Sequence, residues 1–222
     1  MNWQKYVNEN INMNGRRGYV FDDDLPNFYK HSVRLLNAVW SECCNPTDKK
    51  ILDVGCGNGR LPIALTGEDI HIKTYTGIDI VPEAIEFCKK AFVKYPHYNF
   101  FHIPIQNNRY APNQKMNLDE VELPEYDYDI IVANSVFTHL GGFSNAVVYL
   151  KKLKNALVDN GLLYATWFKS PPYEPSNSTK KTVYKQSDIL QLYYDLDLTV
   201  VRTFGGVTTT SVDDQWRIVA RK

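Results

Sequence analysis

The sequence predicts an α/β fold with a doubly wound, mostly parallel sheet, and three observations indicate this class. A short apolar run at 51–54 is followed by a glycine-rich loop and then by helix-forming residues. A second predicted strand, at 74–80, carries an acid, Asp79, near its end, and Pro82 opens a helix shortly afterwards. Apolar strands and amphipathic helices continue to alternate along the rest of the chain, a pattern typical of parallel sheets covered by helices.

The size and charge of the chain favour one globular domain. Of the 222 residues, 44% are hydrophobic and 23% are charged, both ordinary values for a globular protein. The 25 basic residues balance the 25 acidic ones, so the net charge is zero. The chain as a whole therefore has no long-range attraction to nucleic acid or to an anionic membrane, although a local basic patch is still allowed.

The termini and the cysteines favour a reducing, cytoplasmic setting. The first five residues lack the charged-then-apolar pattern of a signal peptide, and no apolar run approaches membrane-spanning length. The four cysteines, which include the adjacent pair Cys43 and Cys44, contain no C-x-x-C spacing. Neither a zinc site nor a disulfide framework is indicated, and we expect no metal.

The sequence of the glycine loop at 55–59 distinguishes between two classes of cofactor site. Glycines remove side chains, so the backbone can turn sharply and a ligand can lie against the N–H groups. A dinucleotide site needs G-x-G-x-x-G, and here Arg60 stands where the third glycine belongs. Asp53, at the end of the strand, would repel a pyrophosphate but would attract a cationic cofactor. An NAD-dependent enzyme is therefore disfavoured.

The stretch 51–60, Ile-Leu-Asp-Val-Gly-Cys-Gly-Asn-Gly-Arg, resembles motif I of the class I S-adenosylmethionine-dependent methyltransferases. The resemblance implies S-adenosylmethionine as cofactor and S-adenosylhomocysteine as product. It also implies a seven-stranded sheet with an antiparallel last strand and an N-terminal helical lid. We expect one methyltransferase domain over 1–222, with the lid at 1–48 and a Rossmann-like core at 49–222. Cys56 then serves as a small spacer within the loop.

A second resemblance concerns the nucleoside part of the cofactor. Gly77-Ile78-Asp79-Ile80 looks like motif II of the same family, in which the acid accepts hydrogen bonds from the ribose hydroxyls and the next residue packs on adenine. Many relatives carry an adenine-binding acid after the third strand, here predicted at 98–103, and this chain has none. We therefore expect backbone groups near Ile105 and the side chain of Gln106 or Asn107 to hold adenine.

The segment after the fourth predicted strand, 129–134, supplies the candidate base. In the family the strand end, here Asn134 with Ser135, lies beside the methyl group, and 135–140 resembles the corresponding segment of many small-molecule members. The ordinary pKa of histidine, about 6.5, suits His139 as general base for a hydroxyl acceptor. A histidine that caps a helix or packs on the strand explains the same pattern.

Two polar segments are candidates for contacts with the acceptor. Arg16 and Tyr19 precede the first core strand, where the family often forms a lid, and Arg109 and Tyr110 lie in the long polar loop 106–126. A solvated turn and a surface loop are the competing interpretations.

The remaining chain predicts further elements of the same fold. We expect helices at 28–40, 61–66, 82–93, 143–157 and 188–194, and strands at 162–168, 196–204 and 215–220. Asn160-Gly161 is expected to end the helix at 143–157, and 169–186 to form a long loop. Within that loop Ser170-Pro171-Pro172-Tyr173 resembles the signature of amino-group DNA methyltransferases, but it follows the fifth strand instead of the fourth, so we interpret it as a coincidence.

The sequence thus predicts a methyltransferase that acts on a small molecule by in-line displacement of the methyl group, with a sugar or natural-product hydroxyl as the preferred acceptor. The alternatives are a nucleic-acid or protein methyltransferase and a non-catalytic cofactor-binding subunit; no oligomeric state is indicated. The predicted cofactor-binding residues are Asp53, Gly55, Cys56, Gly57, Gly59, Arg60, Asp79, Ile80, Ile105, Gln106, Asn134 and Ser135.

Overall fold

The computed structural model describes residues 25–43, 47–108, 110–169, 177–178, 181–205 and 215–222. The chain forms two compact units, 1–103 and 104–222. Within the described ranges, no helix is both long and apolar enough to cross a membrane. The predicted division into a lid at 1–48 and a core at 49–222 stays a prediction.

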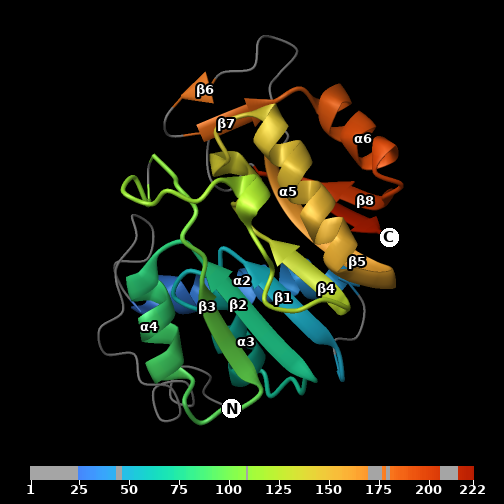
Figure 1. Ribbon diagram of the computed structural model, residues 1–222. Coiled ribbons are helices and arrows are strands. Elements are labelled where there is room, and N and C mark those ends of the chain that lie inside the picture. The colour runs from blue at the N-terminus through green and yellow to red at the C-terminus, as the bar shows by residue number, and fades with distance from the viewer. Residues whose placement is uncertain (1–24, 44–46, 109, 170–176, 179–180, 206–214) are drawn as a thin grey trace. The chain divides into compact units, whose positions relative to one another are not determined.

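The first unit contains a parallel sheet in the order β3-β2-β1 (Figure 1). Its strands are β1 (Lys50–Val54), β2 (Thr74–Asp79) and β3 (Tyr98–His102). Its helices are α2 (Leu25–Cys43), α3 (Arg60–Gly67) and α4 (Pro82–Ala91). Helix α4 packs on β2 and β3, and α2 packs on α3. The predicted order of strand, glycine loop, helix, strand, acid and helix is confirmed.

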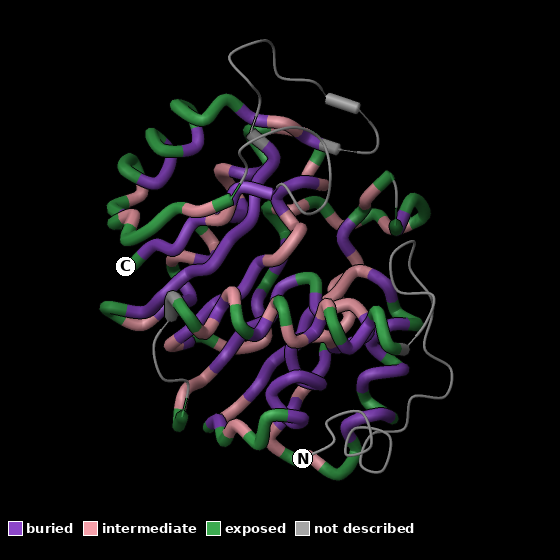
Figure 2. Tube along the Cα trace, turned by 180° about the vertical axis from the view of Figure 1, so that it is seen from behind, coloured by how far each residue is buried: buried purple, intermediate pink, exposed green. Residues whose placement is uncertain are grey.

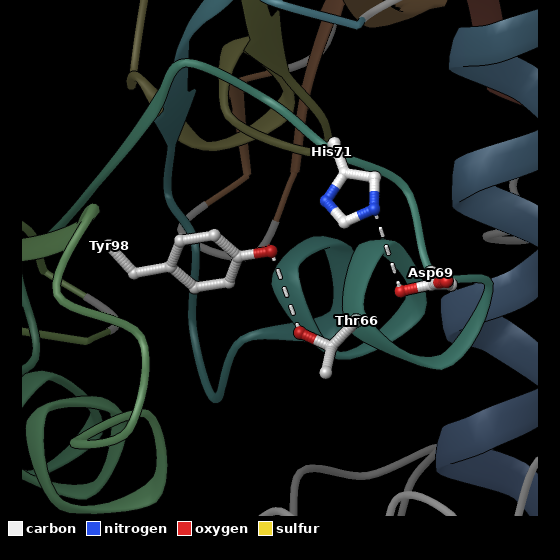
Figure 3. Close-up of polar contacts among 4 residues, drawn as sticks. All are labelled: Thr66, Asp69, His71 and Tyr98. Carbon is white, nitrogen blue, oxygen red and sulfur yellow. Dashed lines mark hydrogen bonds and ion pairs between the residues drawn. The ribbon is translucent and has the colours of Figure 1, made fainter.

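Aromatic side chains fill the space between α4 and the sheet. The ring of Phe92 stacks on that of Phe100, with centroids 5.4 Å apart, and Tyr98 lies 5.7 Å from the same ring. The Thr66 hydroxyl of α3 donates to the hydroxyl of Tyr98 across 3.5 Å, which links α3 to β3 (Figure 3). The nearby pair of His71 and Asp69 is exposed to solvent, so it contributes little to stability.

The second unit contains a mixed sheet in the order β4-β5-β9-β8. Strand β4 (Tyr128–Ala133) runs parallel to β5 (Leu157–Lys169), and β9 (Trp216–Arg221) lies antiparallel between β5 and β8 (Thr199–Phe204). The predicted antiparallel last strand is therefore confirmed. Figure 2 shows that these strands are largely buried, apart from β8. The helical segments are η1 (Leu118–Glu120), η2 (Phe137–His139), α5 (Phe143–Ala156) and α6 (Gln186–Asp195).

A cluster of aromatic residues connects η2 to β5 and α6. The ring of Trp167 stacks on Phe137 with centroids 4.1 Å apart, and its Nε1–H donates to the Tyr193 hydroxyl across 3.2 Å. The Tyr184 hydroxyl donates to the Phe137 carbonyl across 2.8 Å. These hydrogen bonds satisfy the polar atoms of large buried rings, and they fix the backbone of η2.

The structure differs from the sequence prediction at two places. Helix α5 ends at Ala156, next to its predicted end at 157, but Asn160-Gly161 forms no C-cap turn, because that pair lies inside β5, where the register with β4 shifts and the φ angle of Asn160 is +63°. The C-terminal residue holds this irregular stretch, since Lys222 exchanges backbone hydrogen bonds with Asn160 and Gly161. The expected loop 169–186 contains β6 (Asn177–Ser178) and β7 (Lys181–Tyr184), and β7 extends the sheet beside the end of β5.

Candidate functional site

The glycine loop connects β1 to α3 in a backbone conformation that side chains disfavour. The φ angles of Gly55, Gly57 and Gly59 are +71°, +53° and +77°. A Cβ atom on Gly59 would lie 2.9 Å from the ring of Phe92, so core packing requires this glycine. A Cβ atom on Gly57 would meet nothing within 4 Å. The loop therefore leaves open space beside Gly57, where a ligand can approach the backbone.

The side chain of Asp79 holds the glycine loop from the end of β2. Its Oδ2 accepts a hydrogen bond from the Gly57 N–H at 2.8 Å, and its Oδ1 accepts one from the Val81 N–H at 2.9 Å. Burial raises the pKa of Asp79, whereas these backbone hydrogen bonds and the nearby His102 lower it. Each carboxylate oxygen has a second lone pair, so Asp79 can still accept hydrogen bonds from ligand hydroxyls.

A second carboxylate, that of Asp53, lies directly before the glycine loop. Only 3% of Asp53 is exposed, and its Oδ2 accepts a hydrogen bond of 2.6 Å from the Tyr75 hydroxyl. The pKa of Asp53 is raised to about 7, because burial and the charge of Asp79 raise it by more than the Tyr75 hydrogen bond lowers it. A positive ligand charge nearby would favour the ionised form of Asp53.

The other residues of the loop pack tightly. Cys56 and Cys88 are free, buried cysteines, and the Cys88 thiol donates to the Gly57 carbonyl at 3.3 Å. The hydrogen bond with the Cys88 thiol and burial raise the pKa of Cys56, so this thiol is a poor nucleophile and acts as a small packing residue. Arg60 is half-buried at the first position of α3.

These groups fit S-adenosylmethionine better than a dinucleotide. Two carboxylates, Asp53 and Asp79, flank a loop that has open space at Gly57. A sulfonium and an ammonium suit negative surroundings, and ribose hydroxyls suit a carboxylate acceptor, whereas a pyrophosphate would be repelled. The predicted contact of Ile80 with adenine stays a prediction.

In the second unit, Ser135 lies at the centre of a hydrogen-bond network at the end of β4. Its φ angle is +61°, and its backbone N–H donates to Thr166 Oγ1 at 2.7 Å. Its hydroxyl lies 2.8 Å from Nε2 and 3.2 Å from Oε1 of the buried Gln215. Sequence reasoning identified Ser135 and the half-buried Asn134 but missed Thr166 and Gln215, because these partners are far away along the chain.

His139 and Tyr110, two of the predicted site residues, lie together in the second unit. Their rings meet edge to face, with centroids 5.3 Å apart. The backbone of His139 is fixed as well, because its carbonyl accepts a hydrogen bond from Asn107 Nδ2 at 3.0 Å. The long polar loop therefore packs on η2 through specific contacts, and it holds the candidate base in place.

Some of the remaining predicted site residues lie in the described part of the chain and others lie outside it. Ile105 is buried and pairs with Met116, and the exposed Gln106 side chain donates to Asn108 Oδ1 at 2.8 Å. Their predicted contact with adenine stays a prediction. Arg16, Tyr19 and Arg109 lie outside the described residues.

A glycine loop after the first of several parallel strands, with acids at the ends of β1 and β2, defines a nucleoside-cofactor-binding domain of the doubly wound α/β class. Residues 52–163 match the family model described as "Methyltransferase domain". The match spans half of the chain, so the protein belongs to this methyltransferase family. The resemblance to class I S-adenosylmethionine-dependent methyltransferases is thereby confirmed.

Similarity to individual proteins is more distant. The ribosomal protein L11 methyltransferase of Marinomonas sp. (strain MWYL1) is 28% identical over 152 residues, which cover 62% of this chain and 45% of that protein. The chain thus spans about half the length of the curated relatives it matches.

Two solved structures share the fold over nearly the whole chain. The N-methyltransferase NodS from Bradyrhizobium japonicum WM9, in complex with S-adenosyl-L-homocysteine, is 15% identical with a TM-score of 0.59, covering 100% of this chain and 98% of that chain. The 1,6-didemethyltoxoflavin-N1-methyltransferase from Burkholderia thailandensis, with bound 1,6-didemethyltoxoflavin and S-adenosylhomocysteine, is 18% identical with a TM-score of 0.58, covering 99% and 86%. The predicted class I methyltransferase fold is confirmed, and the predicted cofactor is the one whose product these structures contain.

Proposed function

We propose that this chain transfers a methyl group from S-adenosylmethionine to a small-molecule acceptor. The observation that carries the proposal is the glycine loop, which Asp79 holds through the Gly57 N–H while Asp53 lies directly before it. This arrangement offers carboxylates to a cofactor that carries two positive charges on its methionine part and hydroxyls on its ribose. Asp53 with Gly55, Gly57 and Gly59 forms the methionine pocket, and Asp79 binds the ribose.

The chain has few chemical tasks beyond binding. S-adenosylmethionine supplies a methyl group on a sulfonium, which is already a strong electrophile. The protein therefore mainly positions the acceptor and excludes water. His139 accepts the proton of the acceptor hydroxyl on its imidazole; Asn107 fixes its backbone and the Tyr110 ring packs against its side chain.

A small-molecule acceptor, preferably a sugar or natural-product hydroxyl, is favoured for two reasons. The zero net charge provides no general attraction to nucleic acid, and the candidate base lies beside an aromatic ring that could pack on a small acceptor. A protein acceptor is the second candidate, because the chain resembles a ribosomal protein methyltransferase. We place the reaction in the cytoplasm, since Cys56 and Cys88 are free thiols.

Transfer of label from methyl-tritiated S-adenosylmethionine into size-fractionated host extract tests this proposal. Label in the small-molecule fraction is the expected result. Label in protein or nucleic acid would overturn the acceptor class, and the absence of label despite cofactor binding would indicate a non-catalytic subunit.

The role of His139 has its own test once an acceptor is known. We expect His139→Gln to lower kcat by about 10²- to 10⁴-fold, the usual contribution of a general base, and to leave cofactor affinity unchanged. The exposed His71 is the matched control, and His71→Gln should leave both quantities unchanged. A kcat within about twofold of wild type would refute the assignment of His139 as the base.

A further inference from the structure

We propose that Tyr75 is a positioning residue of the cofactor site. Its hydroxyl fixes one oxygen of the Asp53 carboxylate and leaves the other to face the cofactor's ammonium group. This inference rests on the proposed function, and it concerns a residue outside the glycine loop and outside the segment that resembles motif II.

The sequence of β2 gives Tyr75 access to Asp53. Side chains alternate along a strand, so residues 75, 77 and 79 face the same side of the sheet. Asp53 pairs with Gly77 in the parallel register, which places Tyr75 one pleat away on the same face. A Cβ atom on Gly77 would lie 3.1 Å from the Tyr75 ring and 3.0 Å from the Cys56 sulfur. The missing side chain at 77 therefore makes room for the ring that reaches the carboxylate.

The contact itself is short and buried. The Tyr75 hydroxyl lies 2.6 Å from Asp53 Oδ2, and both residues are almost fully inaccessible to solvent. The ring of Tyr75 is held by Tyr98 and Phe100, whose centroids lie 5.3 and 5.6 Å away. This hydrogen bond engages Oδ2, so the second oxygen, Oδ1, is the one that we assign to the ligand.

The hydrogen bond also decides how readily Asp53 ionises. The pKa of Asp53 is raised to about 7: burial raises it most, the charge of Asp79 also raises it, and the Tyr75 hydrogen bond opposes both. The other titratable groups around this pair are Cys56 and Cys88, which interact electrostatically with Tyr75, and His102, which interacts with Asp79. A protonated Asp53 cannot attract a cation, so loss of the hydroxyl should weaken cofactor binding near neutral pH and not at alkaline pH.

The test compares Tyr75→Phe with Tyr98→Phe, using S-adenosylhomocysteine as the probe. Both variants keep an aromatic ring in the same cluster, but the Tyr98 hydroxyl contacts Thr66 instead of Asp53 (Figure 3). Affinity is measured by calorimetry from pH 6 to pH 9, and buffers of different ionisation enthalpy report the protons released. For Tyr75→Phe we expect affinity about tenfold weaker than wild type at pH 7 and within about twofold at pH 9. Tyr98→Phe should follow the wild-type profile.

Each outcome has a distinct meaning. An unshifted pH profile in Tyr75→Phe, or an equal shift in Tyr98→Phe, would overturn the role of Tyr75 while leaving the proposed function standing. Wild-type protein that binds no S-adenosylhomocysteine at any pH would overturn the proposed function and this inference with it. If Tyr75→Phe folds poorly, the affinity of the Asp53→Asn variant is measured instead, and it should not depend on pH between 6 and 9. A pH-dependent affinity in that variant would refute the inference.

Discussion

Replacement of Asp53 by asparagine should stabilise the free protein, although it removes a charge that the site needs. The carboxylate is buried, and its pKa is raised from 3.8 to about 7, so ionising it in the folded state costs free energy. Asparagine has nearly the same shape, carries no charge and can still accept the hydrogen bond that Tyr75 now donates to the carboxylate. The gain should therefore appear as a pH-dependent increase in the free energy of unfolding.

The size and sign of this effect follow from the pKa of Asp53 in the two states. Between pH 4 and pH 7 the folded state binds the Asp53 proton more tightly than the unfolded chain does. Protonated Asp53 therefore contributes its whole stabilisation of the wild type below pH 4, and this contribution is lost as the pH rises to 7. A shift of about three pKa units corresponds to about 4 kcal/mol above pH 7. The burial cost of the asparagine amide lowers the gain equally at every pH, so we expect about 2–4 kcal/mol at pH 8 and about −2 to 0 kcal/mol at pH 4.

Urea unfolding of the cofactor-free wild type and Asp53→Asn at pH 5, 6, 7 and 8 measures this difference. The variant should become more stable relative to wild type as pH rises, with an unchanged m-value. An exposed acid, Asp69, gives the matched control, and Asp69→Asn should show no such trend. A stability difference that stays constant from pH 5 to pH 8, or that favours wild type at pH 8, would refute the assigned ionisation of Asp53.

Three further substitutions separate packing from binding. Gly57→Ala should cost about 1–2 kcal/mol, because its φ angle is positive, and should weaken binding of S-adenosylhomocysteine at least tenfold by filling the open space beside the loop. Gly59→Ala should cost about 3 kcal/mol because it also meets the ring of Phe92, so equal urea midpoints for the two variants would contradict this reasoning. Tyr184→Phe leaves the Phe137 carbonyl without its tyrosine donor and should cost about 1–3 kcal/mol with unchanged cofactor affinity by calorimetry; a neutral effect on unfolding would refute it.

The elements of the fold could be predicted where local sequence determines them. The apolar run before Gly55, the positive φ angles of the loop and Pro82 at the start of α4 follow from residue chemistry within a few positions. The irregular start of β5 could not be predicted in this way. The backbone around Asn160 is held by the C-terminal residue Lys222, a contact that no local pattern indicates.

In the candidate site, too, local sequence predicts some residues and misses those that depend on distant contacts. Asp53 and Asp79 were found from their places at strand ends, but the partners that fix site residues are distant in sequence. Tyr75 could have been found from strand alternation, since it shares a face with Gly77 and Asp79. Gln215 gives no such signal, because its contact with Ser135 depends on the antiparallel insertion of β9 beside β5.

Calorimetric titration of S-adenosylmethionine into the wild type and into Asp79→Ala tests most directly whether this chain binds its cofactor as proposed. We expect wild-type binding, and about hundredfold weaker binding by Asp79→Ala, because hydrogen bonds from both ribose hydroxyls to a carboxylate are lost. Asp69→Ala, which removes an exposed acid, should bind like the wild type. Equal affinity of wild type and Asp79→Ala, or no binding by the wild type, would contradict the proposed cofactor site.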